Sequence, residues 1–237
     1  MKLLKRKPQT FEIQVQDMTL HIQAATDFNE ESRAAALSFW EQLHAYTIRN
    51  PAFSSSRRPI DVPTDAPEIV REMVSSARRA GVGPMFSFQG AVTDHVGRFL
   101  ARDGQEVTVN CGADYYIRSK RRQKLTVVRR PGSTVAVVVP SSKQGVGVSM
   151  SAGARSPDGA GRRGSADSHG TALDGLAVLA ESCMLADAAA AGVQAILEKE
   201  DGFGTALGYL KKVDGVFGGL VISGERIGLM GSLEIAA

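Results

Sequence analysis

The chain has 237 residues, of which 43% are hydrophobic and 22% are charged. This balance is typical of a globular protein and excludes a disordered chain, a collagen-like chain and a coiled coil. The 28 lysines and arginines slightly exceed the 25 acidic residues, which gives a net charge of +3. No run of about 18 apolar residues occurs, so we expect no membrane-spanning helix and no membrane partner.

The two cysteines, Cys111 and Cys183, are too few for a disulfide framework and do not have zinc-binding spacing. The basic residues that follow Met1 are not continued by the apolar stretch of a signal peptide. The sequence therefore predicts a cytoplasmic protein with reduced thiols.

The N-terminal part predicts a hairpin and then a helix. Polar and apolar residues alternate over 11–24, which is typical of antiparallel strands with one buried face. The helix is expected to begin at the capping motif Asp27-x-x-Glu30 and to end before a proline. We expect this hairpin and helix, about residues 10–50, to pack on the rest of a single domain of residues 1–237.

The next part predicts a loop and two more helices. Residues 51–67 contain prolines and serines without periodicity, which is typical of a loop. The motif Asp65-x-x-Glu68 should cap a helix that ends at Gly81. A further helix is expected over about 90–103.

Four strands should follow, over 106–111, 115–118, 124–129 and 134–139. The last of them is apolar throughout, which is typical of a central strand. Glycine and serine then dominate residues 141–170, which show no periodicity and predict an irregular or functional segment.

The C-terminal part predicts an alanine-rich helix over about 181–199 and a glycine-rich hairpin over 220–235. Helices and strands occur in separate blocks along the whole chain, and the strand-pairing signals are those of hairpins. The pattern therefore predicts an α+β fold with antiparallel sheets.

Basic residues concentrate within 118–130: Arg118, Lys120, Arg121, Arg122, Lys124, Arg129 and Arg130. The plain interpretation is a solvated hairpin tip. The functional alternative is a surface for an acidic protein partner or for a small-molecule ligand that bears phosphate. Nucleic acid is not expected, because the nearby tyrosines precede the basic residues and do not alternate with them.

Three aspartates occupy positions that suggest function. Asp94 lies near the start of a predicted helix, Asp114 at a break between strands, and Asp187 within the alanine-rich helix. Burying an unpaired carboxylate is costly, so Asp187 must reach solvent, a partner or a cation. Helix capping and turn formation explain Asp94 and Asp114 nearly as well as function does. We expect the three carboxylates to surround one cleft.

The segments around these aspartates resemble the motifs of a known family. Residues 89–94 (QGAVTD), 110–114 (NCGAD) and 186–191 (ADAAAA) are similar, in this order, to the K-G-Y-A-x-D, N-x-G-G-D and A-D-A-x-x-T motifs of the ApbE family, the FAD:protein FMN transferases. Residues 148–153 (VSMSAG) are similar to the family's T-S-G segment. The resemblance covers about residues 83–235 and is nearest to a shorter branch of the family.

This resemblance implies an α+β, T-fold-like architecture of antiparallel sheets with packed helices. It also implies a flavin cofactor, FAD or FMN, bound by Gly90, Asp94, Gly112, Asp114, Ser149 and Ser151. In the family's transferases the last motif supplies two Mg²⁺ ligands, an aspartate and a threonine four residues later. Asp187 is therefore expected as a metal ligand and a catalytic residue.

Three positions depart from the family pattern. Ala191 stands where the family has the threonine, Gln89 replaces the lysine, and Ala113 replaces the second glycine of the turn. Because alanine offers no oxygen, we expect weak Mg²⁺ binding and the loss of standard Mg²⁺-dependent flavin transfer. A water molecule in place of the threonine oxygen would preserve an FMN transferase, and a ligand- or partner-binding module without catalysis is the third alternative.

Cys111 predicts a second kind of chemistry. A turn lined with backbone N–H groups would stabilise a thiolate and lower the pKa of Cys111, unless Asp114 lies close enough to oppose this effect. Members of the short branch are associated with sulfide assimilation, which implies Cys111 as a catalytic residue that carries a persulfide. The alternative is a cysteine that fills the core. Cys183 should either face Cys111 or fill the core as well.

The leading interpretation is thus an ApbE-like cytoplasmic protein of sulfur or flavin metabolism. An FMN transferase with an altered Mg²⁺ site and a non-catalytic binding module remain the alternatives.

Overall fold

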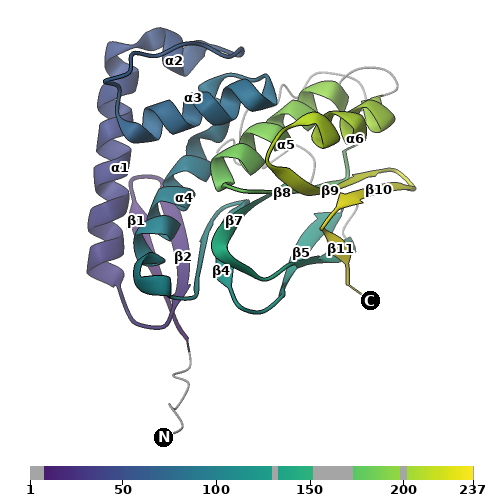
Figure 1. Cartoon of the computed structure of the whole chain (residues 1–237), viewed down its shortest axis with the longest axis horizontal. Helices are drawn as coiled ribbons and strands as arrows, with labels where there is room; N and C mark the ends of the chain where they lie inside the picture. The colour runs from purple at the N-terminus through teal and green to yellow at the C-terminus, as the bar shows by residue number, and fades with distance from the viewer. Residues whose placement is uncertain (1–7, 130–132, 152–172, 198–201, 237) are drawn as a thin grey trace, which may run out of the picture.

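The computed structural model describes residues 8–129, 133–151, 173–197 and 202–236. Two antiparallel sheets form its framework, one of eight strands in the order β1-β2-β3-β4-β7-β8-β9-β10 and one of three in the order β11-β6-β5. Helices cover one face of the larger sheet, and the smaller sheet lies against part of its other face (Figure 1). This arrangement confirms the expected α+β class.

The N-terminal hairpin is part of the larger sheet. Strands β1 (Gln9–Val15) and β2 (Met18–Ala24) pair with each other, and β2 also pairs with the next strand of the sheet. Helix α1 (Asn29–Arg49) packs on this hairpin and ends before Pro51, as expected. Its N-cap is Phe28 and has no side-chain cap, so the predicted cap at Asp27 is wrong; Asp27 accepts from the N–H of Asn29 in the turn before the helix. The hairpin and helix therefore share one core with the elements that follow.

Two further details of the helical part differ from the prediction. A short helix, α2 (Pro51–Ser55), lies within the expected loop. Helix α3 (Glu68–Ala80) begins after Pro67 and has no side-chain cap, so the predicted cap at Asp65 is wrong. Proline has a fixed φ and no N–H group, which makes it compatible with a helix start without a side-chain acceptor. The helix ends at Gly81, whose φ of 69° lies in the left-handed region, as expected.

The remaining elements follow in chain order. The helical ones are η1 (Pro84–Ser87), α4 (Phe88–Leu100), η2 (Arg102–Gly104), α5 (Cys183–Leu197) and α6 (Gly202–Lys212). The larger sheet continues with β3 (Val107–Cys111), β4 (Asp114–Ser119), β7 (Ser142–Ser151), β8 (Gly175–Ala180), β9 (Val216–Ser223) and β10 (Arg226–Gly231). The smaller sheet consists of β5 (Gln123–Arg129), β6 (Ser133–Val139) and β11 (Glu234–Ile235).

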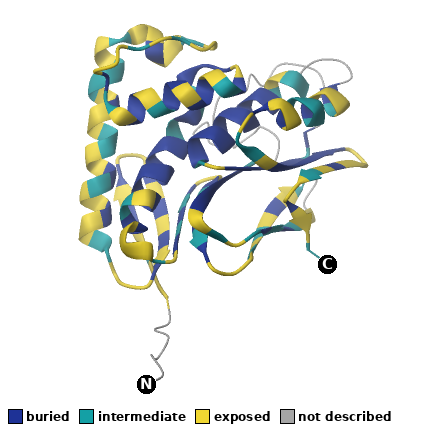
Figure 2. Ribbon diagram, viewed as in Figure 1, coloured by how far each residue is buried: buried dark blue, intermediate teal, exposed yellow. Residues whose placement is uncertain are grey.

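The core fills both faces of the larger sheet (Figure 2). On one face, α4 packs against the strands of the N-terminal half, and α5 and α6 pack against β8 and β9. On the other face, apolar residues of the smaller sheet pack against β4, β7, β8 and β9. Strand β6, predicted as a central strand, lies in the middle of the smaller sheet. Helix α5 is thereby held between the sheet and α3.

Besides α2, three longer elements were not predicted. Residues 142–151 of the segment expected to be irregular form β7, while residues 152–170 of that segment lie outside the described residues. Strand β8 and helix α6 were also missed. The C-terminal hairpin is present as β9 and β10, but β11 leaves it and pairs with β6. No helix in the described part of the chain is long and apolar enough to cross a membrane.

Candidate functional site

The three aspartates of the sequence motifs meet at the first turn of α5. Asp94, on α4, accepts a hydrogen bond through Oδ1 from the backbone N–H of Cys183 at 2.9 Å. Asp187, on α5, accepts one through Oδ2 from the backbone N–H of Gly90 at 3.1 Å. Asp114 begins β4, and its charge acts on Cys183 together with those of Asp94 and Asp187. The two hydrogen bonds tie α4 and α5 together in both directions.

These carboxylates lie inside the protein and do not line an open cleft. The exposed fractions are 3% for Asp94 and 0% for both Asp114 and Asp187. The expected convergence is therefore found, but the expected cleft is replaced by a buried cluster at the start of α5. Asp187 has reached a partner, the Gly90 N–H, which is one of the three outcomes that the sequence left open.

Two glycines allow this close packing. A Cβ atom on Gly90 would lie 2.5 Å from the carbonyl oxygen of Cys183 and 2.9 Å from the Cβ of Asp187. A Cβ atom on Gly147, in β7, would lie 2.1 Å from the backbone nitrogen of Cys183. The start of α5 is thus held between α4 and β7 at distances that only glycine permits. Gly90, expected to contact a cofactor, faces α5 in this structure.

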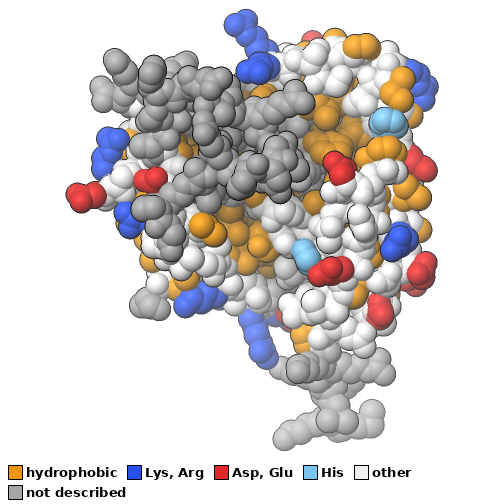
Figure 3. All heavy atoms as spheres, turned by 180° about the vertical axis from the view of Figure 1, so that it is seen from behind, with side chains coloured by type: hydrophobic (Ala, Val, Ile, Leu, Met, Phe, Trp, Pro, Cys, Tyr) orange, Lys and Arg blue, Asp and Glu red, His pale blue; other side chains and the backbone are white. Residues whose placement is uncertain are grey.

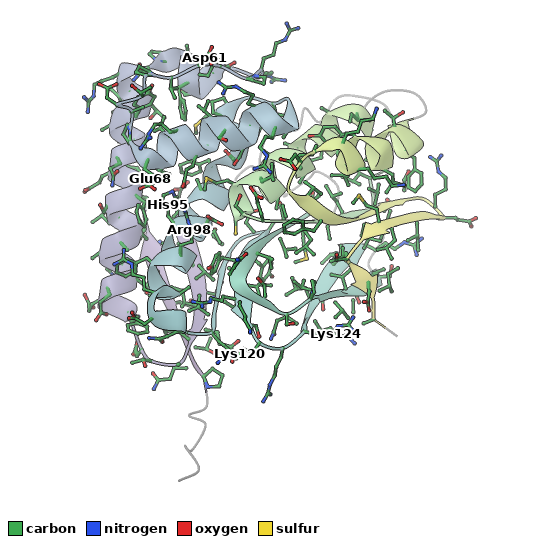
Figure 4. The ribbon with its side chains drawn as sticks, in the orientation of Figure 1. Asp61, Glu68, His95, Arg98, Lys120 and Lys124 are labelled. Atoms are coloured by element: carbon green, nitrogen blue, oxygen red, sulfur yellow. The ribbon has the colours of Figure 1, made fainter. Side chains whose placement is uncertain are left out.

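A charged network behind the cluster fixes Asp94. Its Oδ2 lies 3.0 Å from Nε of Arg98, and Arg98 also pairs with Glu72. Nε2 of His95 lies 2.9 Å from the same Glu72 carboxylate. His95 and Arg98 follow each other along α4 (Figure 4). The network thereby connects α3, which carries Glu72, to the start of α5.

Burial and charge act in opposite directions on the two acids of this network. Burial raises the pKa of Asp94, and the positive charge of Arg98 only partly offsets the rise. Burial also acts to raise the pKa of Glu72, but its interactions with His95 and Arg98 prevail and lower that pKa to about 2. Glu72 is therefore ionised near neutral pH and neutralises the guanidinium group of Arg98 beside it.

The environment of Cys111 contradicts the predicted low pKa. The side chain is 2% exposed, and burial followed by the negative charge of Asp114 raises the pKa of the thiol to about 12. The amide of Asn110 donates to the backbone oxygens of Gly112 and Asp114, so the turn is closed by a side chain. Cys111 is thus a neutral thiol in the core, and the prediction of a stabilised thiolate is wrong.

Cys183 is buried as deeply as Cys111. Its thiol donates a hydrogen bond to the carbonyl oxygen of Tyr115 at 3.0 Å. Burial and the charges of the surrounding aspartates raise its pKa well above the usual value. Both cysteines are free and belong to one core cluster, so they fill the core, which was the second alternative for each.

We expect both cysteines to resist alkylation in the folded protein. At about pH 8, where an exposed cysteine is partly ionised, iodoacetamide should modify neither thiol until the protein is unfolded. Mass spectrometry of native and urea-unfolded samples provides the measurement. Rapid modification of Cys111 in the native sample would restore the thiolate hypothesis, with Cys183 as the internal reference.

Uncharged polar groups border the buried carboxylates. We call Gln89, Gly112, Ser151 and Gln194 the polar strip. A Cβ atom on Gly112, which has a φ of 59°, would lie 3.6 Å from Nε2 of Gln89. Nε2 of Gln194 donates to the hydroxyl of Ser151 at 3.2 Å. Gly112 is exposed and the other three are partly exposed, so the strip is accessible where the carboxylates are not.

The backbone connects the two ends of the polar strip. Ala113 accepts a hydrogen bond through its carbonyl oxygen from the N–H of Met150 at 2.9 Å, which joins the turn after β3 to β7. Ser149, one residue earlier, lies opposite Asp114 and is 2% exposed, so it is part of the buried cluster. Sequence reasoning missed Gln194, although its position seven residues after Asp187 places both on one face of a helix.

The residues present do not fit the Mg²⁺ site that the resemblance implies. Ala191, one turn after Asp187, offers a methyl group that is 8% exposed. Oδ2 of Asp187 is already bonded to the N–H of Gly90. Within residues 8–129, 133–151, 173–197 and 202–236, no three His, Cys, Asp or Glu side chains are grouped so as to bind a metal. Among the described residues, the position beside Asp187 thus lacks the side-chain oxygen that a hard cation would take from a threonine.

Solved structures share the architecture. The flavin transferase ApbE from Vibrio cholerae matches with a TM-score of 0.61 and 14% identity, covering 95% of this chain and 97% of that one. The apo form of the flavinyl transferase ApbE from Pseudomonas stutzeri matches with a TM-score of 0.60 and 14% identity, covering 98% and 96%. At this level of identity the likeness establishes the fold, which is the predicted ApbE-like fold.

Sequence comparisons identify nearer relatives. A UPF0280 protein of Methanosarcina acetivorans is 29% identical over 225 residues, which are 92% of this chain and 81% of the relative. A UPF0280 protein of Methanocaldococcus jannaschii is 29% identical over 212 residues, which are 81% of this chain and 78% of the relative. The model of the family described as AbpE bacteria matches residues 1–201, which is most of the chain. The protein is therefore a member of the AbpE bacteria family, with an ApbE-like fold.

Proposed function

We propose that this protein binds a flavin at the polar strip and does not transfer FMN by the Mg²⁺-dependent route of the flavin transferases. Two features together carry the proposal. The polar strip is accessible and uncharged, and Ala191 stands where the flavin transferases have a metal-binding threonine. The shared fold with flavin transferases supports the choice of ligand.

The chemistry of the polar strip suits a flavin ring. The pyrimidine edge of the ring carries both hydrogen-bond acceptors and an N–H donor, and each glutamine amide offers the complementary pair of groups. Gln89 would bind from α4 and Gln194 from α5, while Ser151 orients the Gln194 amide through their hydrogen bond. The exposed backbone at Gly112 leaves room for an aromatic ring to approach closely. A bound flavin would supply redox chemistry, and the residues would bind and orient it.

A sulfur relay through Cys111 is the weaker proposal. Such a relay requires an accessible thiolate that attacks the outer sulfur of a persulfide or polysulfide donor and releases the donor's thiolate, whereas this thiol is buried and has a pKa raised to about 12. Of the two roles expected from the sequence, in sulfur metabolism or in flavin metabolism, the geometry thus favours the one that involves a flavin.

Titration of the purified protein with riboflavin, FMN and FAD, followed by flavin fluorescence, tests the proposal. We expect binding that is the same with Mg²⁺ and with EDTA. Gln194→Leu should weaken it about tenfold, because one hydrogen bond made in a desolvated contact is lost. The control is Gln42→Leu, since Gln42 is exposed on α1, remote from the polar strip, and its amide donates to Ser38 of the same helix.

Two results would contradict the proposal. One is the absence of saturable binding of any of the three flavins. The other is Mg²⁺-dependent attachment of FMN to an acceptor protein. Ala191→Thr provides a further check, because a restored oxygen beside Asp187 should increase Mg²⁺ affinity only if the rest of a metal site is present.

A further inference from the structure

A large groove lies at the other end of β3 and β4 from the turn that carries Asp114. Its volume is about 1040 Å³. Gln23 and Thr108, which face each other across β2 and β3, lie on its floor. The segments 104–107 and 118–121 and Gln123 also line it, and a smaller cavity of about 100 Å³ adjoins it. Sites for small molecules span about 300–1,000 Å³, so this groove is at the upper end of that range.

Positive charge dominates the lining of the groove. Arg118, Lys120 and Arg121 line it, and Glu106 is the one acidic lining residue that the structure describes. Oε2 of Glu106 already accepts hydrogen bonds from the Ser119 hydroxyl and the Lys120 N–H, each at 3.2 Å. Figure 4 shows Lys120 at the edge of the molecule remote from α2 and α3. Lysine and arginine side chains also lie along the lower part of the face in Figure 3.

Among the described residues, the side chains of Arg118, Lys120 and Arg121 form no ion pair with a carboxylate, whereas other arginines of the protein do. Arg122, the next residue along the chain, forms an ion pair with Glu234 of β11 and does not line the groove. Arg129 donates to the carbonyl oxygen of Gly224. The basic stretch 118–130 is thus divided by the fold. Its N-terminal part gives the groove three cationic side chains against the one carboxylate of Glu106 among the described lining residues, and Arg130 lies outside the described residues.

Arg118 is fixed in place by the backbone. Its Nε donates to the carbonyl oxygen of Lys143 at 2.6 Å, and Nη1 donates to the carbonyl oxygen of Ala101. The guanidinium group lies beside Gly104, whose Cβ position would be 3.7 Å from Nη2. A charge held in this way needs little reorganisation to bind an anion, because its conformational entropy has already been lost.

We propose that this groove binds a phosphate-bearing small molecule of nucleotide size. Fixed arginine and flexible lysine groups are the usual partners of phosphate, and the concave shape favours a compact ligand over an extended chain. Gln23 and Thr108 on the floor provide hydrogen bonds for hydroxyl groups or a base. The inference does not rest on the flavin proposal, because the polar strip begins at the opposite end of β3.

Isothermal titration calorimetry with ADP tests the groove. We expect saturable binding that weakens at least tenfold in the double variant Lys120→Gln/Arg121→Gln. It should also weaken between about 0.05 M and about 0.5 M NaCl, because salt screens exposed charges. The control is Lys211→Gln/Lys212→Gln, which removes the same charge from the exposed end of α6 and should leave ADP binding unchanged.

Four outcomes would overturn the proposal. The first is that ADP does not bind the wild-type protein, and the second is that it binds the Lys120/Arg121 variant equally well. The third is that a hexaglutamate peptide binds where ADP does not, which would make the surface a docking site for an acidic protein. The fourth is that ADP displaces riboflavin, which carries no phosphate, because the two sites would then be one. Loss of riboflavin binding alone would contradict only the flavin proposal.

Discussion

Replacement of Gly147 by alanine should destabilise the protein by about 3 kcal/mol or more, because overpacking against backbone atoms cannot be relieved by a side-chain rotation. The added Cβ would lie 2.1 Å from the backbone nitrogen of Cys183 and 2.1 Å from the carbonyl carbon of Ser182. To accommodate it, β7 and the first turn of α5 would have to separate. That movement would also strain the hydrogen bond from the N–H of Cys183 to the carboxylate of Asp94.

Gly204→Ala is the matched control for this prediction. Gly204 is exposed within α6, and no atom lies within 4 Å of its Cβ position. Alanine favours a helix over glycine, so this variant should be as stable as the wild type or more stable by up to about 1 kcal/mol. Urea unfolding followed by circular dichroism compares the two. Equal stability of the Gly147 variant and the wild type would show that α5 does not pack as described.

Asp94→Ala should cost about 2–3 kcal/mol of stability, because it leaves the N–H of Cys183 at the start of α5 without its acceptor and removes the carboxylate that faces the half-exposed Arg98. Arg98 would keep its ion pair with Glu72. Urea unfolding of the purified variant measures the loss. The exposed pair of Arg78 and Asp61 provides the control, since Arg78→Ala should change stability by less than about 1 kcal/mol.

Asp94→Asn separates the two contributions. Asparagine keeps an oxygen for the Cys183 N–H but loses the charge that faces Arg98. We therefore expect Asp94→Asn to lower the free energy of unfolding, but by less than Asp94→Ala does. If all three proteins unfold at the same urea concentration, the network does not hold the start of α5, and its role would have to be sought elsewhere.

The elements that the sequence predicted are those with one buried face. The alternation in the N-terminal hairpin and the helical spacing of buried residues in α3 both reflect such a face. The alanine-rich helix was recognised by composition. Strand β8 was missed because all its residues are buried, which removes the alternation. Helix α6 carries Gly202, Gly204 and Gly208, which oppose helix formation locally, so its stability must come from packing on α5 and β9.

The sequence predicted which aspartates come together better than it predicted how deeply they are buried. The order of the motifs indicated that the aspartates would converge, and they do. The pKa of Cys111 was predicted in the wrong direction because burial and the approach of Asp114 are properties of the assembled core. Gln194 was missed because its contact with Ser151 joins residues 43 positions apart, and a single sequence does not reveal that distance.

The pairing of β11 with β6 has a consequence for folding during synthesis. The smaller sheet has its first two strands in the middle of the chain, yet its third strand follows every other described element. Until β11 is available, β6 therefore presents an open edge that includes Val137 and Val138 to its surroundings. Unpaired edges of this kind invite association between nascent chains. The chain is thus most vulnerable to such association after β6 has been synthesised and before β11 has, an interval in which β7 to β10 of the larger sheet are made.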